Sequence, residues 1–311
     1  MMIKIKPIKP HRKTNALYVV VFITLIIYVV VLLMPLIWGL FISFVDRDAY
    51  SEYLHNPLVL PTSYTFDNYI NGFADFQIKP LGSYTDQNIF EIVFQTLVYS
   101  GLCSLAATIV PCICAYASAR FNFKFGKVVY GIVIVTMAIP IVGNLPSEIR
   151  VAQAIGTFDN LWLFWIMKAN FLTIYFLLFH SIFKGIPMAY TEAAKIDGAN
   201  NFRIMVHCIM PFALGTLGIV FLLNFINFWN DYQIPYYYLP SYPVVGTAVF
   251  NFSLHYERYG GIPQLIAMIF IVAIPIIVLA IAFNKKLMSN LSDGGIKEWK
   301  KDLVHLLPFL L

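Results

Sequence analysis

The sequence predicts an all-α, polytopic membrane protein, on the grounds of its composition, its apolar stretches and the placement of its basic residues. Of its 311 residues, 59% are hydrophobic and only 12% are charged, about half the charged fraction of an average soluble domain. A water-soluble fold of this length cannot bury so much apolar surface, so part of that surface must face lipid.

Six stretches are apolar and long enough to cross a hydrocarbon core of about 30 Å, which takes about 20 helical residues. These stretches are Leu17–Val45, Ile89–Ser118, Val128–Leu145, Leu161–Phe183, Ile209–Asp231 and Ile262–Phe283. The first stretch is too long, and begins too far from a small-residue cleavage site, for a removable signal peptide, so we expect a retained span. The sequence therefore predicts six transmembrane helices.

The basic residues predict the orientation of these spans. They gather in the N-terminal tail, in the loops after the second and fourth spans, and in the C-terminal tail. Cytoplasmic loops carry the excess of Lys and Arg, so both termini are expected in the cytoplasm. The predicted organisation is a cytoplasmic tail 1–16, a first span 17–45, an extracytoplasmic loop 46–88, a five-helix core 89–283 with a cytoplasmic loop 184–208, and a cytoplasmic tail 284–311.

Two loops have local patterns that predict structure. The outer loop 46–88 carries scattered turn residues and an acidic balance, from which we expect a small cap with one or two short helices. In the cytoplasmic loop, Pro187 suits the first position of a helix that continues to Ile196, and Asp197-Gly198 suits its end, because Gly adopts positive φ easily. Asn200 or Asn201 is then expected to cap the next helix. This elbow is either a docking element or an ordinary surface loop.

The elbow carries a motif that resembles a known family. Glu192-Ala193-Ala194, followed by Asp197-Gly198-Ala199 and by Phe202, Ile209 and Pro211, resembles the EAA motif of ABC-importer permeases. Phe228-Trp229-Asn230-Asp231 and the tail Asn284–Lys297 are similar to the maltose-type carbohydrate permeases, in particular their MalG-like subunit. The chain departs from that pattern in the polar run Gly143–Arg150 and in its extension beyond Lys297.

The resemblance implies a fold, partners and residue roles. The fold would be that of type I (MetI-like) permeases in a bacterial cell membrane. Glu192, Ala193, Ala194, Asp197 and Gly198 would form a coupling helix, with Glu192 pairing to an arginine of an ATPase and Gly198 making the bend. The implied partners are a second, MalF-like permease subunit, two ATPase subunits that bind ATP and Mg²⁺, an extracytoplasmic solute-binding protein and a carbohydrate substrate. The chain itself would hold no cofactor or metal and catalyse nothing.

Polar residues in the fifth span are candidates for a translocation path. Asn224, Asn227 and Asp231 fall on one helix face at i, i+3 and i+7, with Trp229 and Asn230 beside them. Intramembrane polar groups usually face a bundle interior or a water-filled cavity. They would line a sugar path, or else hold the helices together by interhelical hydrogen bonds. Trp229 would stack on a sugar ring or anchor the helix at the interface.

The last outward loop is rich in tyrosine, with Tyr236, Tyr237, Tyr238 and Tyr242 between prolines. These residues would contact the solute-binding protein or form an aromatic belt at the membrane surface.

Other functions are disfavoured by what the sequence lacks. It contains no H-E-x-x-H, Ser/His or paired-aspartate arrangement, and no Walker A loop, so an enzyme is not indicated. The four cysteines show no metal or disulfide pattern. The net charge of +5 comes from basic residues at span ends and does not indicate nucleic acid. An ion-coupled secondary transporter is the alternative, although neither internal repeats nor mid-membrane acids are evident.

Overall fold

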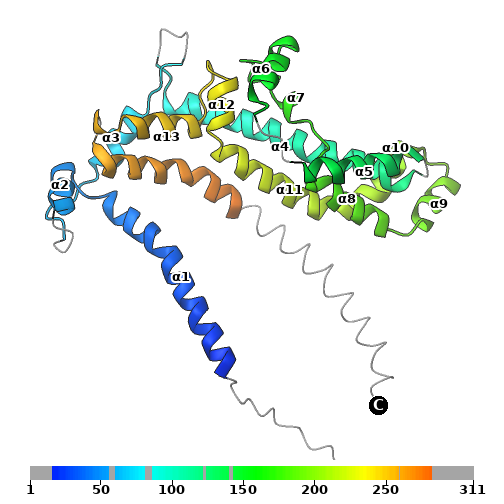
Figure 1. The fold of residues 1–311 in the computed structure, drawn as a ribbon, viewed down its shortest axis with the longest axis horizontal. Helices are drawn as coiled ribbons and strands as arrows, with labels where there is room; N and C mark the ends of the chain where they lie inside the picture. The colour runs from blue at the N-terminus through cyan, green and yellow to red at the C-terminus, as the bar shows by residue number, and fades with distance from the viewer. Residues whose placement is uncertain are drawn as a thin grey trace, which may run out of the picture.

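The computed structural model describes residues 16–55, 60–80, 86–121, 124–139, 143–258 and 260–281. Over these residues the chain is helical, with two isolated antiparallel bridges in place of any strand, Val45 with Tyr64 and Ile78 with Gln87. The helices form one elongated body from which the first helix projects (Figure 1). Almost all of the predicted tails, 1–16 and 284–311, lies outside the described residues.

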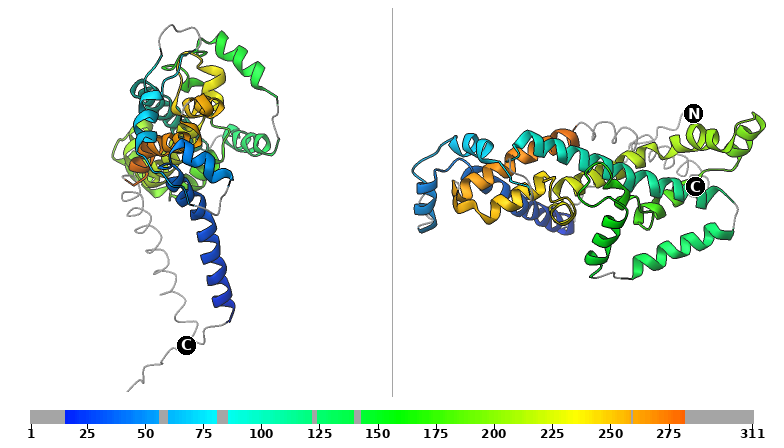
Figure 2. Two further views of the ribbon diagram at one scale, coloured as in Figure 1. Left: turned by 90° about the vertical axis from the view of Figure 1, so that its left-hand side faces the viewer. Right: turned by 90° about the horizontal axis from the view of Figure 1, so that it is seen from above.

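Helix α1 (Ala16–Ile42) stands away from this body over most of its length (Figures 1 and 2). It is apolar on all sides, and its side chains are exposed, as with Tyr18 at 69% and Ile37 at 66%. Its C-terminal end is buried, where Ile42 packs with Val45 and Tyr50. A helix that is hydrophobic all round needs a lipid or protein environment on every side.

Four helices of the described residues are long and apolar enough to cross a membrane: Tyr18–Ile42, Ile89–Arg120, Asn201–Asn230 and Gly261–Ile281. They overlap the first, second, fifth and sixth predicted stretches. The predicted class, an all-α chain with several membrane-spanning helices, is confirmed. The third and fourth stretches hold shorter apolar helices, which include Phe125–Ala138 and Ile174–Gly185.

The fourth stretch was predicted as one helix over 161–183, and this prediction is wrong. Helix α7 (Trp165–Lys168) ends at Ala169, and α8 (Ile174–Gly185) begins after an extended Thr173. Between them the Asn170 side chain accepts the N–H of Leu172 at 2.8 Å. A short polar side chain that bonds the backbone two residues on competes with helical hydrogen bonding, and here it separates the two helices.

The third stretch is also shorter than predicted. Helix α5 (Lys124–Ala138) ends before residue 145, where the predicted span was to end, and α6 (Leu145–Ala154) follows as a separate element. Gly143, just before the start of α6, has φ +79°, a conformation outside the right-handed helical region that glycine adopts without steric cost.

Helix α4 (Ile89–Arg120) is the centre of the body, and α8 and α11 (Met210–Asn230) pack along it. Asn88 caps its start by accepting the N–H of Glu91 at 3.1 Å. Its 32 residues give a length of about 48 Å at 1.5 Å per residue, more than the roughly 30 Å of a hydrocarbon core. The helix therefore reaches from one surface region to the other.

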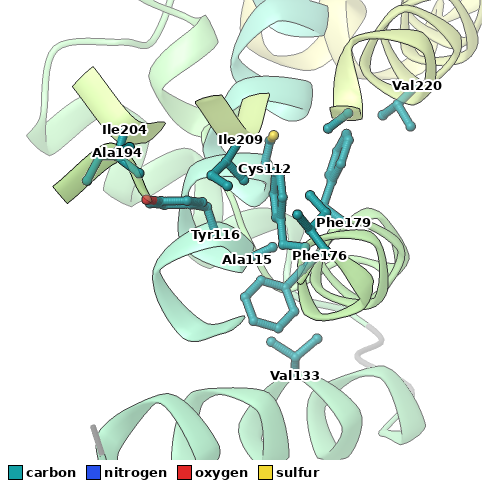
Figure 3. Packing of buried hydrophobic residues seen from close by; sticks show 13 residues of the cluster. Cys112, Ala115, Tyr116, Val133, Phe176, Phe179, Ala194, Ile204, Ile209 and Val220 are labelled. Carbon is teal, nitrogen blue, oxygen red and sulfur yellow. The ribbon is translucent and has the colours of Figure 1, made fainter. Parts of the chain in front are cut away.

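A single apolar core joins α4 and α8 to the elbow. Cys112, Ala115 and Tyr116 of α4 pack against Phe176, Phe179 and Phe183 of α8, and the cluster continues to Ala194, Ile204 and Ile209 (Figure 3). The elbow is therefore attached to the helical body through buried side chains as well as through the chain itself.

At the opposite end, the predicted outer loop contains two short helices, α2 (Arg47–His55) and α3 (Asp67–Asp75). The buried amide of Asn68 donates to the carbonyls of Ser43 and Val45 at 3.0 and 2.8 Å. Gln264 donates to Asp75 at 2.9 Å. These bonds attach the cap to the end of α1 and to the last described helix.

Candidate functional site

The elbow forms at the end of the body farthest from α2 and α3 (Figure 1). Helix α9 (Ala189–Ile196) ends at Asp197, and Gly198 adopts φ +76° as predicted. Asn200 is the residue that caps the next helix, since its side chain accepts the N–H of Arg203 at 2.8 Å. Pro187 does not occupy the first helical position as predicted, because it lies before the flanking residue Met188.

The motif residues of the elbow divide by exposure. Ala194 is buried at 9% and lies beside Tyr116 and Ile204 in the core (Figure 3). The other four motif residues are exposed: Glu192, Ala193, Asp197 and Gly198. The helix thus presents one face to the body and a carboxylate-bearing face outward.

Sequence reasoning missed two exposed apolar residues of the elbow, Tyr190 and Ile196, which accompany Phe202 of the motif. Tyr190, Ile196 and Phe202 are exposed at 50%, 86% and 68%. Large apolar side chains exposed together on the two short helices of a projecting elbow are typical of an interaction surface. Their only sequence signal is that they stand among polar residues in a loop expected to face water.

The polar residues of α11 have different environments, although their spacing places them on one face. Asn224 is buried and donates to Thr108 of α4 at 3.2 Å. Asp231 accepts the hydroxyl of Tyr99 at 3.0 Å and caps the N–H of Ile234 at 3.1 Å. Asn227 is exposed. The spacing alone contained no signal for Thr108 or Tyr99, which lie more than 100 residues away.

Two further residues of the predicted path make contacts within their own helix. Asn230 is exposed and donates to the carbonyl of Ile226 at 2.8 Å. The Trp229 ring is only 2% exposed and stacks on Phe225, with centroids 5.8 Å apart. In this arrangement Trp229 packs inside the protein.

The tyrosine-rich loop contains α12 (Gln233–Tyr238). Its tyrosines, too, are partly buried and partly exposed. Tyr236 and Tyr237 are exposed at 49% and 42%, Tyr238 is buried at 1%, and Tyr242 is half-buried. The Tyr238 hydroxyl donates to Glu148 at 3.0 Å. Burial, together with this bond, raises the pKa of Tyr238 to about 12, so the hydroxyl keeps its proton.

A second set of hydrogen bonds attaches this loop to the segment before α7. Asp159 accepts both the backbone N–H and the hydroxyl of Ser241, at 2.9 and 2.7 Å. The backbone of Asp159 has φ 52°, a left-handed conformation that Asp tolerates better than most residues. Tyr238 and Asp159 therefore hold the loop, while Tyr236 and Tyr237 face outward.

The chain matches a known family and several of its members. Residues 107–287 match the model of the binding-protein-dependent transport system inner membrane component. The diacetylchitobiose uptake system permease protein NgcG of Streptomyces coelicolor is 25% identical, over 88% of this chain and 87% of its own length. The trehalose/maltose transport system permease protein MalG of Thermococcus litoralis is 28% identical, over 88% and 94%.

Solved structures agree on the fold. A chain in the crystal structure of a bacterial ABC transporter involved in the import of the acidic polysaccharide alginate superposes with a TM-score of 0.67, at 21% identity, over 90% of this chain and 99% of that one. The elbow lies inside the segment that the family model matches. Because that match covers more than half of the chain, this protein belongs to the family of binding-protein-dependent transport system inner membrane components.

Proposed function

We propose that this chain is one of two permease subunits of an ATP-driven, binding-protein-dependent importer of a sugar or oligosaccharide. The observation that carries the proposal is the elbow, on which Glu192, Asp197 and Gly198 are exposed while Ala194 is packed into the body. Family membership and relatives named for diacetylchitobiose, trehalose and maltose support the substrate class. They favour it over an ion-coupled transporter.

The proposed arrangement has six spans with both termini in the cytoplasm, and the elbow on the cytoplasmic side. Two ATPase subunits, which bind ATP and Mg²⁺, act on the elbow of this chain and on that of a second permease. The solute-binding protein docks on the outer side, where Tyr236 and Tyr237 are exposed. A crystal structure of a bacterial alginate ABC transporter in complex with its periplasmic protein, similar in fold at a TM-score of 0.58, supports a partner of this kind.

The mechanism is alternating access. ATP-driven closure of the ATPase subunits displaces the elbow, and the body of α4, α8 and α11 rocks against the second permease. Glu192 stands in the first turn of α9, where a carboxylate is favoured by the helix dipole and is free to bond a cationic side chain of the ATPase.

The test is the variant Glu192→Ala in the complete complex. Removing one partner of a buried charge pair costs about 2–5 kcal/mol, so the ATPase should copurify poorly and sugar-stimulated ATP hydrolysis should fall. Lys195→Ala on the same exposed helix is the matched control. If Glu192→Ala retains both the ATPase and wild-type hydrolysis, the elbow is an ordinary surface loop and the proposal loses its main support.

A further inference from the structure

The last residue of α4, Arg120, is a buried cation at the base of the elbow. It is only 9% exposed. Its guanidinium group donates to four oxygens: the carbonyls of Ile186 at 2.6 Å, Pro187 at 3.4 Å and Phe183 at 3.5 Å, and the Thr191 hydroxyl at 2.8 Å. These acceptors come from the end of α8, from the connection that follows, and from the first turn of α9.

The chemistry of this site differs from that of an ordinary buried ion pair. Each acceptor that Arg120 contacts is neutral, and the charge is compensated by carbonyls at the C-terminus of α8, where the helix dipole is negative. A guanidinium group is planar and directs its N–H groups along fixed lines. The positions of α4, α8 and α9 are therefore defined relative to one another by one rigid group.

Apolar packing supports the same junction. Tyr116, one turn before Arg120 on α4, meets the ring of Phe183 edge-on at 5.6 Å. It also lies in the cluster that contains Ala194 of α9 and Ile204 (Figure 3). The elbow thus rests on the end of α4 through an apolar contact and is held there by the hydrogen bonds of Arg120.

Helix α4 connects this junction to the rest of the molecule. Farther along it, Thr108 accepts from Asn224, and Tyr99 donates to Asp231 at the outer end of α11. Thr96 accepts the N–H of Val245 at 2.8 Å, at the start of α13 (Val245–Leu254). One continuous helix is hydrogen-bonded to the elbow at one end and to the outer elements at the other.

We infer that Arg120 is a positioning residue for transport: it locks the elbow to α4, so that a displacement of the elbow moves α4 and, through it, α11 and the outer elements. This inference rests on the proposed function, in which the elbow is where the ATPase acts. It adds a residue and a route that lie outside the elbow motif.

The competing role for Arg120 is to cap the end of α8 and nothing more. The two roles involve different acceptors, because the carbonyls belong to α8 and its connection whereas the Thr191 hydroxyl belongs to α9. Thr191→Val keeps the size of the side chain and removes only the bond from Arg120 to α9. Thr191→Ser keeps the hydroxyl and is the matched control.

The experiment measures ATP hydrolysed per sugar imported by the complete complex in proteoliposomes. The test variants are Thr191→Val and Arg120→Lys, the second of which replaces the planar guanidinium by a single ammonium. In both we expect the ATPase to remain bound. The ratio of ATP to sugar should rise roughly tenfold, which corresponds to the loss of one hydrogen bond to a charged group. Thr191→Ser should keep the wild-type ratio. The double variant should be little worse than the stronger single one, because both changes break the same contact.

A wild-type ratio in assembled complexes of Thr191→Val would overturn the inference and leave Arg120 as a cap of α8. If Arg120→Lys fails to insert, the Thr191 pair decides alone, because neither of its variants alters the charge. Failure of the proposed function is distinguishable, since it would appear in Glu192→Ala as unchanged ATPase binding and hydrolysis.

Discussion

At the scale of single residues, the structure separates polar side chains that the sequence places together. Asn224 is bonded to Thr108, whereas Asn227, one turn farther on, is exposed in this subunit. An exposed amide in a membrane-spanning helix must face another polar surface or a water-filled path. Asn227 is therefore the better candidate for contact with sugar, and Asn224 for holding α4 against α11.

This separation predicts opposite results for two matched variants. Asn227→Leu should reduce sugar uptake while the complex assembles normally. Asn224→Leu should instead weaken the packing of α11 on α4 within the subunit by about 0.6–2 kcal/mol, the range measured for interhelical hydrogen bonds in membranes. The loss should be seen as a lower melting temperature in detergent. Loss of assembly in Asn227→Leu would show that this residue, too, holds helices together.

Tyr238 is a second residue whose role depends on burial. Folding raises its pKa to about 12, above the value of about 10 for an unfolded tyrosine. A raised pKa stabilises the fold through the protonated form, so the contribution is complete below about pH 10 and disappears as the pH rises through the folded pKa.

We therefore expect Tyr238→Phe to lower stability by about 1–3 kcal/mol at neutral pH, because Glu148 loses a buried donor. The difference from wild type should shrink as the pH rises from about 10 towards about 12. Melting temperatures over this range measure it, with the exposed Tyr236→Phe as control. An equal effect of both substitutions at neutral pH would contradict the assigned role of Tyr238 as the anchor of the loop.

At the scale of elements, the turn after α9 depends on one backbone conformation. Gly198 has φ +76°, and a Cβ added there would meet no atom within 4 Å. Substitution would therefore act through backbone strain and not through a steric clash with neighbours. β-Branched residues are the least tolerant of positive φ, whereas Asn visits this region with little cost.

Gly198→Val should accordingly distort the elbow and release the ATPase, and Gly198→Asn should retain it. Both variants should insert normally, because Gly198 is exposed and lies outside the long apolar helices. Copurification of the ATPase is the measurement. Equal retention in both variants would mean that the position of α9 does not depend on this turn.

At the scale of the whole molecule, α1 and the elbow show that the chain is built for assembly. The α1 side chains are exposed along most of the helix, and the elbow presents Ile196 at 86% exposure. The first surface needs lipid or another membrane protein, and the second is where the proposed function places the ATPase. The chain by itself leaves both surfaces, α1 and the elbow, uncovered.

The orientation of this body is testable with single cysteines. Ile70→Cys, in α3, should react with a membrane-impermeant thiol reagent from outside intact cells, and Lys195→Cys, in α9, should react after the cells are opened. Both native residues are exposed, so access and not burial decides the result. The unsubstituted chain is the background control, and labelling of Lys195→Cys in intact cells would overturn the proposed topology.

Short-range features could be predicted from the sequence because the interactions that cause them lie within a few residues. Apolar stretches long enough to span lipid, the positive φ of Gly198 and the cap at Asn200 all belong to this class. The elbow motif belongs to it as well, because its spacing is local. The break at Asn170 was local too, but the apolar residues on both sides made the stretch resemble one continuous span.

Which distant residues meet was decided only by the tertiary structure. Arg120 lies 71 residues from Thr191, Tyr238 lies 90 from Glu148, and Asn224 lies 116 from Thr108. Likewise, no pattern within α12 distinguishes buried Tyr238 from exposed Tyr237. The sequence by itself determined the membrane class and the elbow, since lipid length and backbone conformation act locally. Tertiary packing decided the polar partners: α4 meets α8, α9 and α11, and α12 meets α6. A buried donor needs an acceptor, and only folding brings these acceptors near.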